Sequence, residues 1–385
     1  MSAAHTARRL AALAPGGLVA LVGDAARTGA INLALGTPAA PVTPPAMVDA
    51  ACAALREGMH QYEMPDGNPE LRRRIGSALV PPADPLTEVT VTVGATEALS
   101  VALLATLDPG DEVIVFEPFY ENFVTAIVVA GGVPRIVPLR PPEWRYDPAE
   151  LHAAFGPRTR AVVLNTPHNP TGRVFGRDEL GEIASLCEHW GATAISDEVY
   201  SGFVFDGRSH VSAADVPGLE DRSIVVGSLS KSHAVSGWRL GYLRACAALT
   251  AVLRQVHVTV GGVAATPLQL AAARAADFGP PPDDLSAQRD AALRAFSELG
   301  LDCIAPEGGC YVMCGTGAVT DADSEAFVKR LVQEAGVLVA PGRFFYSSAG
   351  GGDDLIRVAF NRPPELFDEV QERLRAAMGS NVVVQ

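Results

Sequence analysis

The sequence predicts an α/β fold, with a large domain built on a mostly parallel β-sheet flanked by helices and a smaller α+β domain beside it. Between about residues 88 and 245, short β-rich runs alternate with helical runs, a pattern typical of parallel sheets wrapped by helices. A Pro- and Gly-rich stretch over 278–284 then interrupts the pattern, as expected of a domain boundary. The 385 residues suffice for two domains with a substantial core.

The alternating region starts with a valine-rich strand and ends with two strands on either side of a short segment rich in serine and glycine. Its predicted elements are strand 89–93, helix 97–107, strand 113–116, helix 119–129, strand 161–164, helix 178–190, strand 193–196, strand 224–227 and strand 238–243. Ligands of such sheets lie beyond the carboxyl ends of the strands. We therefore expect the functional residues at or just after these strand ends.

The domain organisation follows from the same patterns. We place the large domain at residues 45–278. The small domain combines residues 1–44 with residues 279–385, where a helical segment is followed by strands around 311–314 and 356–359.

Composition restricts the classes of function. A hydrophobic fraction of 48% and a charged fraction of 19% describe an ordinary globular protein. The net charge of −14 argues against a nucleic-acid partner, because proteins that bind nucleic acids carry basic surfaces. No apolar run reaches the roughly 18 residues that span a bilayer, and Pro15, Gly16, Gly17 and Asp24 interrupt the apolar core of any signal peptide. We expect a cytoplasmic protein without a membrane partner.

The six cysteines are scattered along the chain without the paired spacing of metal ligands. Such usage is typical of reduced thiols in a cytoplasmic protein. We therefore expect no metal site.

One lysine has an unusual setting. Lys231 lies between two predicted core strands, close to Ser228 and Ser230, with Arg239 eight residues further on. A lysine is most often a solvated surface amine, but one removed from water beside another cation loses its proton more readily and can form a Schiff base. The guanidinium suits a bidentate grip on a phosphate, and the hydroxyls add donors. Together these residues favour pyridoxal 5'-phosphate as a cofactor.

The segment 228–241 resembles the lysine signature of class I and II aminotransferases, which are fold-type-I pyridoxal-phosphate enzymes of the aspartate aminotransferase superfamily: Ser-x-Ser-Lys is followed by Gly-Trp-Arg-Leu-Gly. The resemblance extends over about residues 31–375, with further motifs in the expected order. Residues 266–269, TPLQ, are similar to the branch that contains kynurenine, methionine and N-succinyl-diaminopimelate aminotransferases. The family implies a seven-stranded sheet in the large domain.

The resemblance also implies the reaction. An amino group would move between an L-amino acid and a 2-oxo acid in two ping-pong half-reactions, through a Schiff base on Lys231. The same amine would then act as the general acid and base.

Two glycine-containing turns follow predicted strands. Gly94, Ala95 and Thr96 open a helix, whose N-terminal N–H groups favour a phosphate, although such a turn is often only a connection. Residues 165–172, NTPHNPTG, form a rigid turn similar to the family's Asn-Pro-x-Asn-Pro-Thr-Gly motif. The match implies that Asn169 binds the phenolic oxygen of the cofactor and helps to seat the substrate carboxylate.

Asp197 ends another predicted strand. An isolated aspartate there is usually a helix cap or a solvated loop residue, whereas in a pyridoxal enzyme it keeps the pyridine nitrogen protonated and makes the ring an electron sink. The resemblance assigns this role to Asp197 and a hydrogen bond to the phenolic oxygen to Tyr200. An aromatic residue after strand 113–116 can stack on the ring, and the family pattern favours Tyr120 over Phe119.

The remaining matches concern the substrate and a second subunit. The arginine in strand 355–360, Arg357, matches the family's clamp for the substrate carboxylate, for which a bidentate fork is suited; its alternatives are an outward-facing residue or an internal salt bridge. Gly36 matches the glycine that meets the same carboxylate. Tyr62 matches the tyrosine that reaches the phosphate of the neighbouring subunit, which implies a homodimer. Arg343 is either a second anion contact or a surface or interdomain residue.

Two alternatives stay open. Because the cofactor supplies the chemistry, the same residues also serve lyases or cyclases that act by β- or γ-elimination, including enzymes of specialised metabolism. A catalytically inactive or regulatory pyridoxal-binding protein is the other class. The donor and acceptor are not readable from the sequence.

Overall fold

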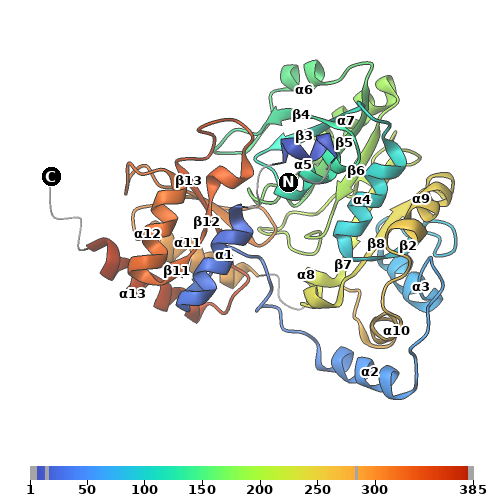
Figure 1. Cartoon of the computed structure of the whole chain (residues 1–385), viewed down its shortest axis with the longest axis horizontal. Helices are drawn as coiled ribbons and strands as arrows, with labels where there is room; N and C mark the ends of the chain where they lie inside the picture. Colours follow the sequence, from blue (N-terminus) through green and yellow to red (C-terminus); the bar gives the residue numbers. More distant parts are fainter. Residues whose placement is uncertain (1–6, 14–16, 282–284, 380–385) are drawn as a thin grey trace, which may run out of the picture.

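The computed structural model describes residues 7–13, 17–281 and 285–379. Figure 1 shows two parts, a larger one around a central sheet and a smaller one formed by the chain from α11 (Ser286–Ser297) onward together with α1 (Gly17–Thr28). The predicted boundary over 278–284 extends into residues 282–284, which lie outside the described residues. The boundaries at 45 and 278 stay a prediction.

The large sheet confirms the predicted fold class. Its order is β2-β8-β7-β6-β5-β3-β4, and it is mostly parallel because only β8 runs antiparallel to its neighbours, β2 and β7. In chain order the strands are β2 (Val89–Val93), β3 (Glu112–Glu117), β4 (Val133–Pro138), β5 (Thr159–Asn165), β6 (Thr193–Asp197), β7 (Ser223–Ser228) and β8 (Leu240–Ala245).

Helices cover both faces of this sheet, because its strands are rich in valine and isoleucine on both sides. One face packs against α4 (Gly94–Thr106), α5 (Glu121–Val129) and α9 (Ala247–Val260). The other face packs against α6 (Pro148–Ala154) and α7 (Arg177–Trp190) at one end. At the other end lie α2 (Pro45–Arg56), α3 (Pro69–Ala78) and α10 (Thr266–Ala275).

The second part contains an antiparallel sheet of order β12-β13-β10-β9. Its strands are β9 (Asp302–Ile304), β10 (Tyr311–Gly315), β12 (Ala340–Pro341) and β13 (Leu355–Ala359). The helices α11 (Ser286–Ser297), α12 (Ser324–Ala335) and α13 (Glu365–Gly379) pack against it in one core, which also takes in Leu18 and Leu33. Next to it, β1 (Ile31–Asn32) pairs in parallel with β11 (Val337–Leu338), so the N-terminal segment joins the C-terminal part.

Two local predictions were wrong, and one strand was missed. Strand 238–243 begins only at Leu240, because Trp238 belongs to the 3-10 turn η3 (Ser236–Trp238) and Arg239 is left-handed, with φ 53°. The predicted loop around Lys231 contains a short helix, α8 (Leu229–Ser232), whose first turn is capped by the Ser228 hydroxyl. Strand β4 was not predicted because it holds two prolines, which edge strands tolerate.

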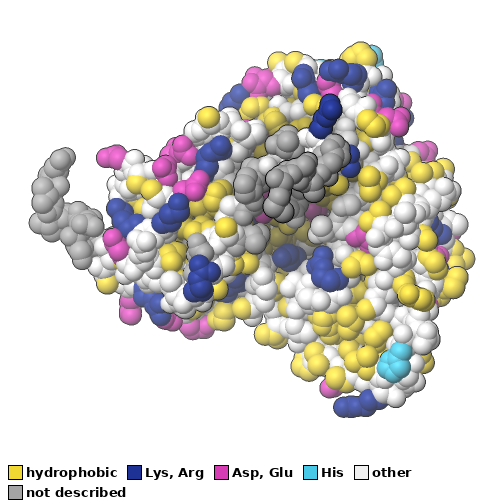
Figure 2. Space-filling view, in the orientation of Figure 1, with side chains coloured by type: hydrophobic (Ala, Val, Ile, Leu, Met, Phe, Trp, Pro, Cys, Tyr) yellow, Lys and Arg dark blue, Asp and Glu magenta, His cyan; other side chains and the backbone are white. Residues whose placement is uncertain are grey.

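The surface is partly apolar. Figure 2 shows hydrophobic side chains gathered on the lower part of the molecule, where α2 and α10 lie. Among the described residues, no helix is long and apolar enough to cross a bilayer.

Candidate active site

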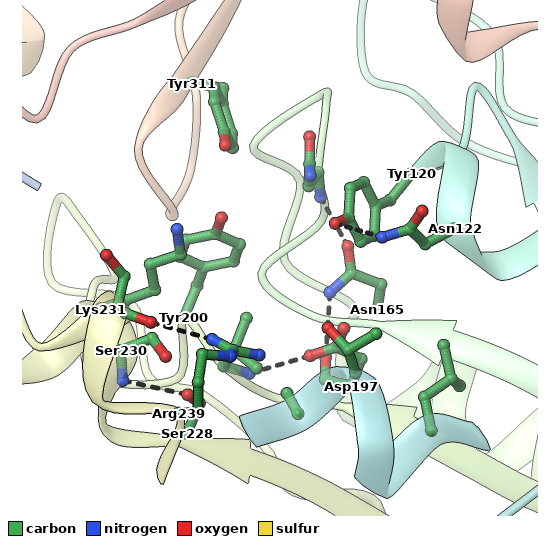
Figure 3. Close-up of a pocket in the computed structure, with 16 residues that line it drawn as sticks. Tyr120, Asn122, Asn165, Asp197, Tyr200, Ser228, Ser230, Lys231, Arg239 and Tyr311 are labelled. Atoms are coloured by element: carbon green, nitrogen blue, oxygen red, sulfur yellow. Dashed lines mark hydrogen bonds between the residues drawn. The ribbon is translucent and has the colours of Figure 1, made fainter. Parts of the chain in front are cut away.

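A pocket of about 180 Å³ opens where the carboxyl ends of β5, β6 and β7 meet the N-terminus of α4. Parallel strands bring their ends to one edge of the sheet, so residues far apart in the sequence converge there. Figure 3 shows their side chains around one space. The lining residues are Ala95, Thr96, Leu99, Tyr120, Asn122, Asn165, Asn169, Asp197, Val199, Tyr200, Ser228, Ser230, Lys231, Ser236, Arg239 and Tyr311.

One end of the pocket is built to bind an anion. Ala95 and Thr96 lie in the first turn of α4, where backbone N–H groups have no acceptor within the helix and favour a negative charge. A Cβ atom at Gly94, which has φ +75°, would overlap the Arg239 guanidinium, so glycine lets the arginine pack against the helix terminus. Among the described residues no carboxylate forms an ion pair with Arg239. Its Nη1 donates only to the carbonyl oxygen of Ser236, at 3.0 Å.

Lys231 reaches the middle of the pocket from α8 (Figure 3). Its Nζ donates a hydrogen bond to the carbonyl oxygen of Gly36, at 2.8 Å. The same carbonyl accepts a hydrogen bond from Asn361 Nδ2 at 3.1 Å, which holds the N-terminal segment against the pocket. The amine is thus held in place by a neutral acceptor and forms no ion pair within the described residues.

Asp197 lies at the end of β6 with only 8% of its surface exposed. Its one hydrogen-bond donor within the described chain is the Val199 N–H, at 3.2 Å. Burial raises the pKa of the carboxyl to about 7, against the opposing effects of that hydrogen bond and of the Lys231 charge. A buried carboxylate with so little support needs a cationic partner, and a protonated pyridine nitrogen fits this need.

Asn165 joins two of the strand ends. Its Nδ2 donates to the Asp197 carbonyl oxygen at 3.0 Å, and its Oδ1 accepts from the Asn169 N–H at 2.7 Å. The side chain therefore fixes the turn that carries Asn169 relative to Asp197 (Figure 3).

Aromatic side chains line the rest of the pocket. Tyr120 lines it, whereas Phe119 packs into the core beside α5. Burial raises the pKa of Tyr120 to about 12, and its hydroxyl accepts a hydrogen bond from Asn122 Nδ2 at 2.6 Å. The buried rings of Tyr200 and Tyr311 meet edge to face at 6.1 Å, and burial raises the pKa of Tyr200 well above its usual value.

Arg357 lies in β13 next to these aromatic side chains and is only 2% exposed. Its Nη1 donates to Asn169 Oδ1 at 2.7 Å and its Nη2 to the Ala34 carbonyl oxygen at 2.6 Å. The guanidinium lies 4.0 Å from the ring centroid of Tyr311 and 4.4 Å from that of Phe345. Its Nε has no partner, and among the described residues no carboxylate pairs with it. Such an arginine is poised for an anionic ligand, because a buried charge is otherwise costly.

The model of the family described as aminotransferase class I and II matches residues 28–374. The chain belongs to this family. It is an enzyme of amino-group transfer, and amino acids and 2-oxo acids are the substrates that the family implies.

Relatives support this assignment. The chain is 33% identical to kynurenine–oxoglutarate transaminase 3 of Mus musculus, over 91% of this chain and 86% of the relative. It is 34% identical to a probable N-succinyldiaminopimelate aminotransferase of Mycobacterium tuberculosis, over 91% and 93%. The solved structure of an N-succinyldiaminopimelate aminotransferase from Mycobacterium tuberculosis superposes with a TM-score of 0.92 at 33% identity and covers 97% of this chain and 100% of that one.

Most residues predicted for this aminotransferase site surround the pocket. Gly36 and Arg357 adjoin it through Lys231 and Asn169. Tyr62 does not line it and is 90% exposed. Arg343 lies elsewhere: its Nη1 donates to the Tyr346 carbonyl oxygen at 2.9 Å, and it lines a separate surface pocket with acidic residues.

The sequence reasoning missed Asn122, Asn165 and Tyr311. Asn165 carried a usable signal, since it directly follows the predicted strand 161–164 and opens the turn that carries Asn169. Tyr311 lies in a β-rich run and Asn122 near a helix start, where the same residue types serve packing or capping. Only the fold brings these two side chains to the pocket.

Proposed function

We propose that this aminotransferase binds pyridoxal 5'-phosphate covalently through Lys231 and moves an amino group from an L-amino acid to a 2-oxo acid in two half-reactions. The convergence of Lys231, Asp197 and Arg239 on one pocket carries the proposal. The Lys231 amine can react with the aldehyde of the cofactor. The buried Asp197 carboxyl suits its ring nitrogen, and the Arg239 guanidinium suits its phosphate. When bound, the cofactor supplies an electron sink for the carbon that loses its proton.

The other lining residues have complementary tasks. The N–H groups of Ala95 and Thr96 and the Ser228 hydroxyl would complete the phosphate site. Asn169 and Tyr200 would donate to the phenolic oxygen, and Tyr120 would stack on the ring.

Arg357 would bind the substrate carboxylate through its guanidinium, together with Asn169 and the backbone of Gly36. This grip orients the substrate Cα–H bond toward the Lys231 amine. The amine would take the proton from Cα as a general base and then, as a general acid, deliver it to the C4′ atom of the cofactor. In the second half-reaction a 2-oxo acid binds to the same arginine.

Reductive trapping tests the covalent link. Lys329 is the other lysine of the sequence, exposed on α12 near Glu325, and serves as a matched control. After loading with pyridoxal 5'-phosphate and reduction with borohydride, we expect the adduct on Lys231 in wild type and Lys329→Ala. Lys231→Ala should carry none and should lose at least about 10³-fold in turnover. An adduct on Lys329 alone would refute the proposal.

A product assay separates transfer from elimination. We expect glutamate to form when 2-oxoglutarate is supplied with kynurenine, methionine or N-succinyl-diaminopimelate, the compounds in the names of similar aminotransferases. A lyase or cyclase would instead release ammonia or a thiol without a keto acceptor. A bound cofactor whose absorbance never shifts with any amino acid would indicate an inactive relative.

We also propose a homodimer in which Tyr62 reaches the site of the partner subunit. Tyr62 is exposed in a short stretch that also exposes the apolar side chains of Met59 and Met64. This stretch adjoins α9 and α10, because His257 Nε2 contacts the Pro65 carbonyl oxygen at 2.8 Å and Thr266 donates to Gln61. Several large apolar side chains exposed so close together favour a subunit interface. Light scattering should give twice the chain mass, and Tyr62→Ala should weaken cofactor binding without changing that mass.

A further inference from the structure

Two cysteines face each other across neighbouring strands of the small sheet. Cys303 of β9 and Cys314 of β10 are directly opposite in the antiparallel register, and their sulfur atoms lie 2.6 Å apart. A disulfide has an S–S distance of about 2.05 Å, so a bond requires the two sulfurs to approach by only about half an ångström. The strand register already provides the geometry.

We propose that Cys303 and Cys314 form a modification site, at which hydrogen peroxide converts the two thiols into an intramolecular disulfide. The Cys303 thiolate attacks one peroxide oxygen, the O–O bond breaks, and a sulfenic acid and one water form after protonation. The Cys314 sulfur then attacks the Cys303 sulfur, the S–O bond breaks, and a second water leaves. In total the thiols lose two hydrogen atoms and the peroxide is reduced to water.

The surroundings assign the two roles. Cys303 is only partly buried, and hydrogen bonds from Cys314 and Ser297 lower the pKa of its thiol. Cys314 is fully buried, and burial raises the pKa of its thiol well above the usual value. Because the thiolate is the reactive form and Cys303 is the more accessible of the two thiols, Cys303 reacts with the oxidant and Cys314 resolves the intermediate.

The other cysteines lack this arrangement. Cys52 is exposed, and Cys187 and Cys310 are buried. All six cysteines belong to the described residues, and among them only Cys303 and Cys314 are in sulfur–sulfur contact. The modification is therefore specific to one pair.

The link would tie the edge strand to the substrate side of the pocket. Strand β9 is the outer strand of its sheet, and β10 joins it to β13. Next to Cys314, Met313 pairs with Arg357, and the same strand begins with Tyr311, which lines the pocket. A covalent bond here fixes the strand that supports the carboxylate clamp.

Mass spectrometry of the full chain tests the site without an activity assay. After treatment with stoichiometric hydrogen peroxide, we expect the mass of the chain to fall by about 2 Da. Subsequent alkylation under denaturing conditions should then modify four of the six cysteines. Dithiothreitol should restore all six. Because no lysine or arginine lies between Arg294 and Lys329, trypsin leaves Cys303, Cys310 and Cys314 on one peptide. Cleavage after Glu307 and Tyr311 separates them and identifies the bond.

Two variants complete the test. Cys303→Ser should abolish the mass loss and leave Cys314 open to alkylation, whereas the matched control Cys52→Ser should keep the bond. The proposal fails if wild-type Cys303 gains two oxygen atoms while Cys314 stays free, or if the bond joins any other pair.

Discussion

Two neighbouring carboxyl groups at the end of β6 face opposite sides of the large sheet and have opposite electrostatic surroundings. Asp197 faces the pocket and accepts one hydrogen bond, from the Val199 N–H. Glu198 lines a crevice with His210 instead. Both residues are less than 9% exposed, so burial alone does not distinguish them.

Their pKa values differ because their partners differ. Burial raises the pKa of Asp197 to about 7. Burial also acts to raise the pKa of Glu198, but His210 and several hydrogen-bond donors outweigh it and lower that pKa. The donors to Glu198 are the hydroxyls of Ser196 and Ser212, the Ala213 N–H and the ring of His210, at 2.8, 3.2, 2.9 and 3.0 Å. Other residues of the chain thus provide the hydrogen bonds that Glu198 needs, whereas Asp197 is left with few partners and can pair with a ligand.

The arginines of the pocket follow the same rule. Within the described chain, Arg173 pairs with Glu179 away from the pocket, whereas Arg239 and Arg357 pair with no carboxylate. Both arginines at the pocket therefore keep a charge that an anionic ligand can neutralise.

The largest effect is expected on turnover, when the charge of Asp197 is removed. Asp197→Asn keeps the size of the side chain but removes the charge that the cofactor ring needs, so kcat/KM for an amino donor should fall by roughly 10²–10³-fold. The free energy of unfolding at pH 7 should not decrease, because the charge has little support within the chain. Urea unfolding and steady-state kinetics measure the two quantities. A large loss of stability with normal turnover would make Asp197 a structural residue.

Substitution of Glu198 should lower the stability of the fold rather than turnover. Glu198→Ala leaves His210 and three further donors without their acceptor, and we expect it to lower the free energy of unfolding by about 3 kcal/mol. Glu198→Gln keeps an acceptor and should destabilise less. For the folded fraction, turnover should change less than about tenfold, because Glu198 does not line the pocket. If Glu198→Ala instead impairs turnover as much as Asp197→Asn, the two carboxyl groups act as one unit.

The sequence predicted the pocket side of this contrast but not the role of Glu198. Lys231, Asp197 and Asn169 were found because each follows a predicted strand, and parallel strands present their ends together. Apart from Ser196, the partners of Glu198 come from residues 210–213, more than ten residues further along the chain, so no local pattern distinguishes it from Asp197. Tyr311 was missed for a similar reason, since it reaches the pocket only through the pairing of β10 with β13.

A pH series of the cofactor-free protein tests the two neighbours separately. The folded pKa of Asp197 lies above its unfolded value of 3.8, so its contribution to stability is full below about pH 4 and is lost as the pH rises to 7. Wild type should therefore lose up to a few kcal/mol relative to Asp197→Asn across this window. Adding pyridoxal 5'-phosphate should remove the difference in slope.

Glu198 should give the opposite slope. Its folded pKa lies below the unfolded value of 4.5, so its contribution is present above pH 4.5 and is lost as the pH falls through the folded pKa. Unfolding free energies of Glu198→Gln should therefore lack the acid-side decline of wild type. Parallel slopes for Asp197→Asn and Glu198→Gln would contradict the contrast.

The smallest expected effect concerns a neutral contact on the pocket side. Asn122 Nδ2 donates to the Tyr120 hydroxyl at 2.6 Å, and because the pKa of Tyr120 is about 12 this hydroxyl keeps its proton at neutral pH. Asn122→Ala should release the ring and weaken pyridoxal 5'-phosphate binding by roughly fivefold, the equivalent of about 1 kcal/mol. Tyr120→Phe removes the same hydrogen bond from its other end, so fluorescence titration of the double variant should show no larger loss than either single variant. Additive losses would mean that Asn122 acts on the pocket independently of Tyr120.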